Sequence, residues 1–407
     1  MLGRRIFLDR AVKLMMSTST LVAGGAIAAK PEVAEAAEPL VPEFVDYDPR
    51  GSVGRLERLG ELDLESKMNF HAGFLRFLAK EIRPVIEERF NEILDDHGLD
   101  GSKNIPAKKT LALVKDDPVI SMRQRGWLSN QQVMYNALQS EFAENEEVYL
   151  KELDSASRVG PGRLELNPTL KIPEFARHEI HIQPGGYVGS PFAGYINYFS
   201  VNNFYDALIG ANYQDQLQMG IVKKLPLPKT GKVLRVLDLG CGTGRVTFAL
   251  KQRFPAAEIW GLDVAAPMLR FAHMRGVDLG VDVNFRQALA SKTGFPSGFF
   301  DVVTANILFH ETSEKEAKAV MRETKRLLRP GGVFYPTDLP NGKQLPKRTA
   351  FANFSQWIDH KINNERWRVE WEKMDFAKSL KRVGFEVDET VEAGGFIYGK
   401  ILATKPV

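Results

Sequence analysis

One short stretch of the chain combines strand-forming residues and glycines at a spacing that suits nucleotide binding. Residues 236–244 read VLDLGCGTG, so an apolar run ends in three alternating glycines, Gly240, Gly242 and Gly244. Glycine adopts left-handed backbone conformations at no steric cost and lets a ligand approach the main chain closely. An amphipathic helical pattern follows at 245–254. A strand, a glycine turn and a helix in this order open a nucleotide-binding βαβ unit.

Expected strands and helices alternate along the chain after this glycine turn, and they must hold it in position. Six further strands are expected at 258–263, 281–286, 299–309, 333–338, 385–391 and 396–403. Helical patterns separate them at 265–276, 313–328 and 350–383. The alternation predicts an α/β fold, a doubly wound, mostly parallel seven-stranded sheet with helices on both faces.

A mainly helical region is expected over 41–215, before a domain at 216–407. Its helical patterns cover 56–97 and 128–153, where apolar residues recur every three or four positions. The segment 178–215 is rich in aromatic residues, with glycines and prolines in its first half. It is either a packed aromatic connection or a lid over the substrate, since glycine hinges and aromatic walls suit both. The candidate substrate contacts in it are Tyr187, Tyr195, Tyr198 and Tyr205.

The first forty residues lie outside the expected fold. Arg4 and Arg5 precede Ile6-Phe7-Leu8, and a mildly apolar stretch rich in small residues follows. This start resembles a bacterial twin-arginine export leader, which implies a signal segment at 1–40 and export, or a tether that associates the chain with a membrane. A targeting or unstructured tail on a cytoplasmic protein is the alternative.

Charge and cysteine content exclude some classes of function. The 407 residues hold 54 Lys and Arg against 51 Asp and Glu, so no nucleic-acid partner is expected. Cys241 is the single cysteine, so a disulfide within the chain is ruled out. We interpret Cys241 as a small packing residue. We expect no metal site, and the oligomeric state is left open.

The spacing of the glycines separates two cofactor classes. The dinucleotide fingerprint G-x-G-x-x-G would place its third glycine at Arg245, whereas Gly244 comes one residue earlier. Asp238 stands two residues before Gly240, so the pattern is D-x-G-x-G-x-G. This form resembles the first motif of class I S-adenosylmethionine (SAM)-dependent methyltransferases.

Three further motifs over residues 233–407 agree with that family. Asp263 ends the second strand, nineteen residues after Gly244, in the context D-V-A-A-P-M-L. FFDVVTANILFHE, at 299–311, resembles the fourth strand of the family, and RLLRPGGVFYPTD, at 326–338, resembles the fifth. The resemblance implies a SAM-dependent methyltransferase and says little about the acceptor.

The resemblance also implies which residues bind SAM. A carboxylate can accept both ribose hydroxyls, the role implied for Asp263, and Asp238 is placed to hold the ammonium end. Gln287 stands where the family contacts adenine, commonly through an Asp, and Asn306 lies where the family lines the methionine side. The expected cofactor-binding residues are Asp238, Gly240, Gly242, Gly244, Asp263, Val264, Gln287, Ala288 and Asn306.

Methyl transfer requires alignment of donor and acceptor, and a hydroxyl acceptor also requires a base. His310, with Glu311 beside it, follows the fourth strand at the edge where such sheets bind ligands. A neutral imidazole with an acid partner acts near neutral pH, although a packing or capping histidine is an equal reading. His178 and His181 are rival candidates for the base.

These features predict methyl transfer from SAM to a small apolar or aromatic acceptor, by O- or C-methylation. A non-catalytic SAM-binding protein is the first alternative, because binding and turnover use different residues. An NAD-dependent oxidoreductase is the second, and the position of Gly244 argues against it.

Overall fold

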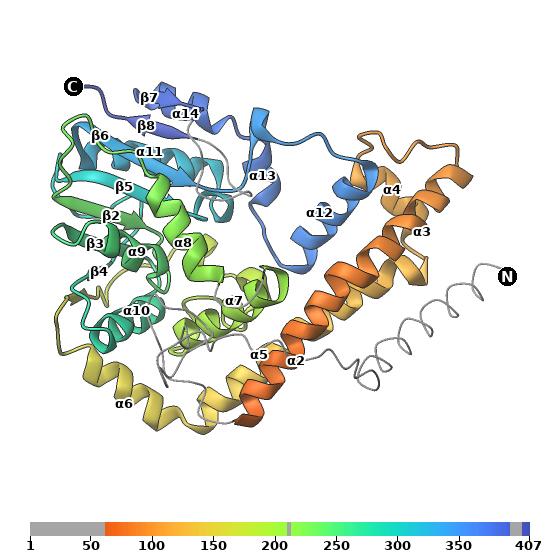
Figure 1. The fold of residues 1–407 in the computed structure, drawn as a ribbon, viewed down its shortest axis with the longest axis horizontal. Coiled ribbons are helices and arrows are strands. Elements are labelled where there is room, and N and C mark those ends of the chain that lie inside the picture. Colours follow the sequence, from red (N-terminus) through yellow and green to blue (C-terminus); the bar gives the residue numbers. More distant parts are fainter. Residues whose placement is uncertain (1–61, 210–212, 391–400) are drawn as a thin grey trace, which may run out of the picture. The chain divides into compact units, whose positions relative to one another are not determined.

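The computed structural model describes residues 62–209, 213–390 and 401–407, which belong to one compact unit. Its strands are β1 (Leu164–Glu165), β2 (Arg235–Leu239), β3 (Glu258–Asp263), β4 (Asn284–Gln287), β5 (Phe300–Asn306), β6 (Leu328–Thr337), β7 (Glu386–Asp388) and β8 (Leu402–Thr404). They form one sheet in the order β1-β4-β3-β2-β5-β6-β8-β7 (Figure 1). The strands from β1 to β6 pair in parallel, and β8 is antiparallel to both of its neighbours. The expected α/β class and mostly parallel sheet are confirmed.

The count of seven strands was wrong by one. β1 lies far before the glycine turn in the chain and adds to the edge of the sheet, where Leu164 pairs with Phe285 and Glu165 with Arg286. Arg286 also donates from Nε to Glu165 at 2.6 Å. A two-residue strand is too short to show the alternation of apolar and polar residues that marks a strand in a sequence. The expected strand at 396–403 falls mostly on residues outside the described ranges.

Helices cover both faces of the sheet, as a doubly wound fold requires. The helices in and after the glycine motif are α9 (Arg245–Arg253), α10 (Ala266–Asp278), α11 (Glu314–Leu327), α12 (Ala350–Ile362), α13 (Arg368–Lys373) and α14 (Phe376–Val383). On one face, α9 and α10 pack with α8 (Tyr213–Lys224) on the strands. On the other, α11 and α14 pack in a separate apolar cluster. The helical region expected at 350–383 is thus three helices.

The region before the domain is mainly helical, as expected. Its elements are α2 (Leu62–Phe77), the π-helical turn η1 (Leu78–Ile82), α3 (Arg83–Asp96), α4 (Ala107–Val114), α5 (Pro118–Glu144), α6 (Glu146–Ala156), α7 (Ala193–Ile209) and two 3-10 turns, η2 (Glu174–Ala176) and η3 (Ile180–Ile182). Two more 3-10 turns, η4 (Phe309–Glu311) and η5 (Gly342–Gln344), lie in the domain. Asp117 begins α5, where its side chain accepts from the backbone nitrogens of Val119 and Ile120.

The helical region packs directly onto the domain. Phe142 of α5 and Tyr195 of α7 share an apolar cluster with Phe271 of α10. At a second place, the ring of Phe90 in α3 lies 5.1 Å from that of Phe354 in α12. In the described part of the chain, no helix combines the length and the apolar character needed to cross a bilayer. Residues 1–40, with the expected leader, lie outside the described residues.

Candidate functional site

The glycine turn between β2 and α9 adopts the conformation that only glycine tolerates well. Gly240, Gly242 and Gly244 have φ angles of 66°, 52° and 81°. A Cβ atom on Gly240 would lie 2.8 Å from Leu308, and one on Gly244 would lie 3.0 Å from Phe248. A Cβ atom on Gly242 would meet only the terminal methyl of a methionine, at 3.5 Å. Gly244 therefore permits helix packing, whereas Gly242 leaves room for a ligand at the backbone.

Asp263 lies beside this turn, at the carboxyl end of β3. Its carboxylate accepts from the backbone nitrogen of Gly242 at 3.0 Å and from that of Ala265 at 2.9 Å. Burial raises the pKa of Asp263, and these backbone hydrogen bonds oppose the rise. A carboxylate offers about four acceptor positions, so two stay open for ribose hydroxyls. The turn and this carboxylate fit the sugar end of SAM.

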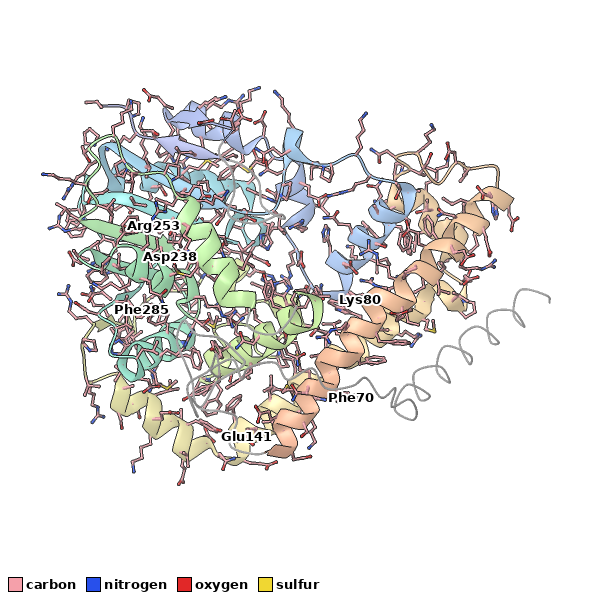
Figure 2. All side chains as sticks on the ribbon, in the orientation of Figure 1. Phe70, Lys80, Glu141, Asp238, Arg253 and Phe285 are labelled. Atoms are coloured by element: carbon pink, nitrogen blue, oxygen red, sulfur yellow. The ribbon has the colours of Figure 1, made fainter. Side chains whose placement is uncertain are left out.

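Asp238 lies in the interior between β2, β5 and α9 (Figure 2). It accepts from the hydroxyl of Thr247 at 2.7 Å and from that of Thr304 at 3.0 Å. Burial raises its pKa to about 7, against the effect of these two hydrogen bonds. The group therefore changes charge near neutral pH, and its contact with an ammonium group stays a prediction.

The polar ends of Gln287 are already engaged within the protein. Its amide oxygen accepts from the backbone nitrogen of Asn167 at 2.9 Å, and its amide nitrogen donates to the carbonyl of Val264 at 3.1 Å. An adenine contact through this side chain would replace one of these bonds. The backbone nitrogen of Ala288 donates to the carbonyl of Asp263 at 3.1 Å. Gln287 and Ala288 thus support the edge of the site, and their binding role stays a prediction.

Asn306 ends β5 at the same edge of the sheet. Its amide oxygen accepts from the hydroxyl of Thr337, at the end of β6, at 2.8 Å. The contact ties the ends of two neighbouring strands together. Because the amide oxygen is used in this contact, the amide nitrogen is the group of Asn306 that could contact the methionine part of SAM. A contact between Asn306 and this part of SAM is what the sequence predicts.

His310 is held between two carboxylates. Its Nδ1 atom lies 2.6 Å from a carboxylate oxygen of Asp338, and its Nε2 atom lies 3.2 Å from one of Glu311. Burial alone would lower the pKa of His310, but the two carboxylates raise it to about 10. This shift favours the charged form of His310 at neutral pH, which does not suit the neutral imidazole base expected at this position, and a catalytic role for His310 and Glu311 stays a prediction. Asp338 directly follows β6 and was missed because nothing local in the sequence links it to His310.

Glu311 has a carboxylate that is buried and open to a ligand. Both of its oxygens are buried, and among the described residues neither accepts a well-formed hydrogen bond, although Nε2 of His310 lies 3.2 Å from one of them. The Nε2 atom of His181 lies 3.4 Å away, at ion-pair distance. Burial would raise the pKa of Glu311, but the charge of His310 holds it near about 2. The carboxylate is therefore ionised at any ordinary pH.

His178 has the properties that were expected of His310. Its Nδ1 atom lies 2.7 Å from the backbone carbonyl of Phe175, which assigns the hydrogen to Nδ1 and leaves a lone pair on Nε2. That Nε2 atom is buried and has no partner within the described ranges. Burial lowers the pKa of His178, while the charge of Glu311 opposes the effect. His178 is therefore neutral at pH 7.

These groups form what we call the His–Glu cluster, made of His178, His181, His310, Glu311 and Glu365. Glu365 joins it through His181, whose Nδ1 atom lies 3.7 Å from a Glu365 oxygen. No group of three or more His, Cys, Asp or Glu side chains in the described residues has the geometry of a metal site.

Strained backbone surrounds the cluster. In the described ranges, the non-glycine residues with positive φ are His181, Ile182, Ile307 and Asn364, at 54° to 56°. All four lie within the cluster or within three residues of a member. The conformation is unfavourable for a branched side chain such as isoleucine, and strain of this kind gathers at functional sites. Asn364 also donates to the carbonyl of Glu179 at 2.9 Å, which ties the segment around His178 to the end of α12.

Tyr187 lies within electrostatic range of both halves of the site. Burial raises its pKa well above the usual value, and the charges of Glu311 and Asp263 add to the rise. The residue is thus near the cofactor side and near the His–Glu cluster. A substrate contact through Tyr187 stays a prediction, and its position supports it.

The other three tyrosines lie in packed helical structure. Tyr195 and Tyr198 are buried on α7, and the ring of Tyr198 lies between the guanidinium groups of Arg245 at 5.0 Å and Arg275 at 4.5 Å. Tyr205 packs at the margin of the apolar cluster of α8 and α9. The second half of the segment considered as a lid is thus helix α7, and packing explains these three tyrosines without a substrate.

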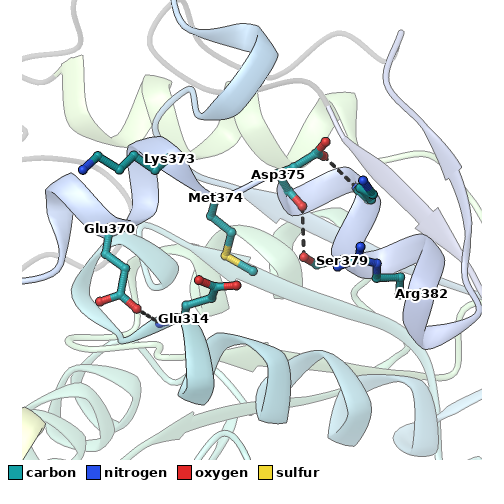
Figure 3. Close-up of a pocket in the computed structure, with 8 residues that line it drawn as sticks. Glu314, Glu370, Lys373, Met374, Asp375, Ser379 and Arg382 are labelled. Atoms are coloured by element: carbon teal, nitrogen blue, oxygen red, sulfur yellow. Dashed lines mark hydrogen bonds between the residues drawn. The ribbon is translucent and has the colours of Figure 1, made fainter.

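A surface pocket lies apart from these residues, over α11, α13 and α14 (Figure 3). It is lined by Glu314, Glu370, Lys373, Met374, Asp375, Lys378, Ser379 and Arg382. Its polar groups are largely satisfied by one another; for example, the backbone nitrogen of Glu314 donates to Glu370 at 2.7 Å. None of the expected site residues lines it.

Comparison with known proteins agrees with the geometry of the cofactor side. Residues 236–332 match the methyltransferase domain family. The demethylmenaquinone methyltransferase of Thermus thermophilus is 39% identical over 128 residues, which are 31% of this chain and 54% of that enzyme. The ubiquinone/menaquinone biosynthesis C-methyltransferase UbiE of Burkholderia vietnamiensis is 36% identical over 99 residues, 24% of this chain and 40% of that enzyme. The chain thus spans about half, or less, of the length of these relatives.

Solved structures overlap with part of the chain. The pyocyanin biosynthetic protein PhzM has a TM-score of 0.40 at 18% identity, covering 53% of this chain and 59% of that one. Phosphoethanolamine N-methyltransferase 2 of Haemonchus contortus, solved with SAM, has a TM-score of 0.34 at 19% identity, covering 43% and 38%. These overlaps say nothing about the acceptor. The family match and the related enzymes identify residues 236–332 as a methyltransferase domain of the class I superfamily, with SAM as its cofactor.

Proposed function

We propose that this chain transfers a methyl group from SAM to a small aromatic acceptor whose hydroxyl group lies in the His–Glu cluster. The observation that carries the proposal is a set of buried acceptor atoms that accept no well-formed hydrogen bond among the described residues, namely Nε2 of His178 and the two oxygens of Glu311, one of which has only ion-pair contacts with His310 and His181. Buried polar atoms in folded proteins normally have hydrogen-bond partners. A hydroxyl group of the acceptor would supply the missing donor.

His178 is the base in this proposal. The carbonyl of Phe175 holds the hydrogen on Nδ1, so the lone pair of Nε2 is free to take the hydroxyl proton. The imidazolium that forms is stabilised by the ionised Glu311 nearby, whose charge already raises the pKa of His178. His310 positions Glu311 by the ion pair at 3.2 Å. When bound, SAM supplies an electrophilic methyl group.

Two observations support an aromatic acceptor. Tyr187 places a half-buried aromatic ring within electrostatic range of Glu311 and Asp263. The related enzymes are named for demethylmenaquinone methylation and for ubiquinone/menaquinone biosynthesis, and these names support a quinone-like, aromatic acceptor for this chain. Loss of a phenolic proton activates both the oxygen and the ring carbons, so this cluster serves O- and C-methylation alike.

The test combines binding and turnover on the full chain. SAM is titrated calorimetrically, and release of S-adenosylhomocysteine is followed with a panel of phenols and hydroquinones. His178→Gln and Glu311→Gln should lower kcat/KM by about 10²- to 10⁴-fold and leave SAM affinity unchanged. His97→Gln, at an exposed histidine, is the matched control.

Other outcomes reject parts of the proposal. Turnover that survives both substitutions would remove the cluster from the reaction. SAM binding without release of S-adenosylhomocysteine across the panel would favour a non-catalytic SAM-binding protein. Failure to bind SAM at millimolar concentration would reject the cofactor role of this chain altogether.

For residues 1–40 we propose a twin-arginine leader that either directs export or tethers the chain to a membrane. The support is the Arg4-Arg5 pair and the apolar stretch after it. Cell fractionation and sequencing of the mature N-terminus test it. A cytoplasmic protein that begins at Met1 would reject both roles.

A further inference from the structure

A buried arginine with unused donors lies next to the His–Glu cluster. Arg368, the first residue of α13, is 6% exposed, and its Nε and Nη1 atoms have no hydrogen-bond partner among the described residues. Glu372 approaches Nε to only 3.5 Å. That carboxylate already accepts from both terminal nitrogens of Arg348, at 3.2 and 3.1 Å, and from Gln356 at 2.7 Å. The charge of Glu372 is therefore shared, and Arg368 keeps donors to spare.

Two further buried nitrogens near Arg368 lack partners within the described parts of the chain. They are Nε1 of Trp367 and Nδ1 of His360, so all three side chains belong to the short stretch 360–368. Burial, together with the charge of Arg368, lowers the pKa of His360 to about 4. His360 is thus neutral at pH 7 and can donate one hydrogen. Unsatisfied buried donors, one of them charged, are costly in a folded protein unless a ligand fills them.

This group of donors is held against the same edge of the sheet as the His–Glu cluster. The ring of Trp371 in α13 stacks 6.0 Å from that of Phe309 in η4, the turn that contains His310 and Glu311. The indole nitrogen of Trp371 donates to the carbonyl of Leu339 at 2.9 Å, just after β6. α13 is therefore fixed on the turn that presents Glu311.

The charges facing Arg368 define what could bind there. Its acidic neighbours are Glu372 and Glu365; burial raises the pKa of Glu365, and the charge of Arg368 is one of the positive charges that oppose this rise. The guanidinium of Arg348 faces the same carboxylate of Glu372, so two arginines share one close acid. An anionic group is therefore attracted to Arg368, whereas the carboxylates of Glu311 and Glu365 repel it from the His–Glu cluster.

We propose that Arg368, together with Trp367 and His360, binds a carboxylate of the acceptor, so that the acceptor is a hydroxylated aromatic acid. The inference rests on the proposed function, because the hydroxyl end of the same molecule would lie at Glu311 and His178. The planar fork of a guanidinium matches a carboxylate with two parallel hydrogen bonds. The indole and imidazole N–H groups would complete the set, and the opposite charges at the two ends would orient the ring.

The test compares an acid with its neutral analogue on the full chain. The protein, saturated with S-adenosylhomocysteine, is titrated calorimetrically with 4-hydroxybenzoate and with 4-hydroxybenzamide. We expect the acid to bind at least tenfold more tightly than the amide. Arg368→Met should weaken binding of the acid by about 10- to 100-fold and change binding of the amide little, because a charge-assisted pair of hydrogen bonds is lost.

Two milder variants and one control keep the test sharp if Arg368→Met fails to fold. Arg368→Lys keeps the charge and loses the fork, so the acid should bind with intermediate affinity. Trp367→Phe keeps a ring and removes only the N–H group, and the acid should bind a few-fold more weakly. Arg382→Met changes an exposed arginine on α14 (Figure 3) and should leave both affinities unchanged.

The titrations are repeated without S-adenosylhomocysteine so that the two proposals can fail separately. An acid that binds through Arg368 in a chain that ignores SAM and S-adenosylhomocysteine would overturn the proposed function alone. An acid that binds no better than the amide, or equally well to Arg368→Lys and the unaltered chain, would overturn this inference alone. Tighter binding of phenyl phosphate than of 4-hydroxybenzoate would reject the carboxylate assignment.

Discussion

The Nδ1 atom of His310 lies 2.6 Å from a carboxylate oxygen of Asp338, which raises the pKa of His310 and favours its charged form. Asp338 also accepts from the backbone nitrogens of Phe309 and Leu339, both at 2.7 Å. One carboxylate at the end of β6 thus holds the whole η4 turn in place. Because Glu311 belongs to η4, this contact also fixes the position of the Glu311 side chain in the interior.

Asp338→Asn should lower the free energy of unfolding at pH 7 by about 3–5 kcal/mol, because it leaves the buried charge of His310 without its nearer partner and with Glu311 alone, at 3.2 Å. The pKa of His310 is about 10 in the folded chain and 6.5 as its reference value, so the pair stabilises fully below about pH 6.5. This stability is lost as the pH rises toward 10. The difference between variant and parent should therefore shrink over that range.

Urea denaturation at several pH values measures this effect. Asp282→Asn, at an exposed aspartate, serves as the control and should unfold like the parent at every pH. A difference between Asp338→Asn and the parent that stays constant from pH 6 to pH 10 would contradict a charged His310.

Asp263→Ala should weaken SAM binding by about 1–3 kcal/mol, the value of a hydrogen bond to a charged group. The carboxylate keeps acceptor positions beside its bonds to Gly242 and Ala265, and these positions suit the ribose hydroxyls. Calorimetric titration of SAM measures the change. Asp282→Ala should bind SAM like the parent, and equal affinities for all three proteins would reject the assignment of Asp263.

SAM affinity should rise as the pH rises through about 7, because the pKa of Asp238 is raised to about 7 by burial. Only the ionised carboxylate attracts the ammonium end of the cofactor, so affinity gains up to about tenfold per pH unit below that value. Binding should also release a proton, which calorimetry in two buffers of different ionisation enthalpy detects. The amino group of SAM titrates too, so the comparison with Asp238→Asn isolates the carboxylate.

The raised pKa of Asp238 also affects the stability of the protein without SAM. Its folded pKa lies above the reference value of 3.8, so its contribution to stability falls as the pH rises from about 4 to about 7.

A pH profile of SAM binding that is the same for Asp238→Asn and the parent would show that Asp238 does not meet the ammonium group.

Alanine at Gly242 and at Gly244 should have different effects. Both positions have positive φ, so each substitution costs about 1–2 kcal/mol of backbone strain. At Gly244 the new Cβ also meets Phe248 and Phe285, so Gly244→Ala should lose more stability. At Gly242 the Cβ makes only an ordinary 3.5 Å contact with a methionine methyl, so Gly242→Ala should lose SAM affinity beyond its loss of stability.

Gly231→Ala is the matched control for both variants, since its φ is +68° and nothing lies within 4 Å of the added carbon. It should show the strain alone. Thermal unfolding and SAM titration separate the three variants. If Gly242→Ala and Gly231→Ala bind SAM equally well, the space at Gly242 is not the cofactor site.

Several features of this protein are determined by the sequence alone. The glycine turn at 240–244, the strands β2 and β3 and the helix α11 are where the local pattern predicts them, within one or two residues. These elements depend on short-range properties, namely runs of apolar side chains and the conformational freedom of glycine. The cofactor class is implied by the resemblance of this local pattern to the class I SAM-dependent methyltransferases, and the pattern is local because Asp238, Gly244 and Asp263 belong to one βαβ unit.

Only the tertiary structure decided which residues lie together around the proposed acceptor site and which charge each of them favours. His310, Asp338, His178 and Arg368 come from four distant parts of the chain. The pKa of a side chain depends on its burial and on the charges that folding brings beside it. Folding placed Asp338 beside His310 and made it a cation, whereas it placed a backbone carbonyl beside His178 and left it neutral. His310 and His178 thus differ in charge although both are histidines. The sequence around each histidine could not predict this, because the partner that sets its charge is brought beside it only by folding.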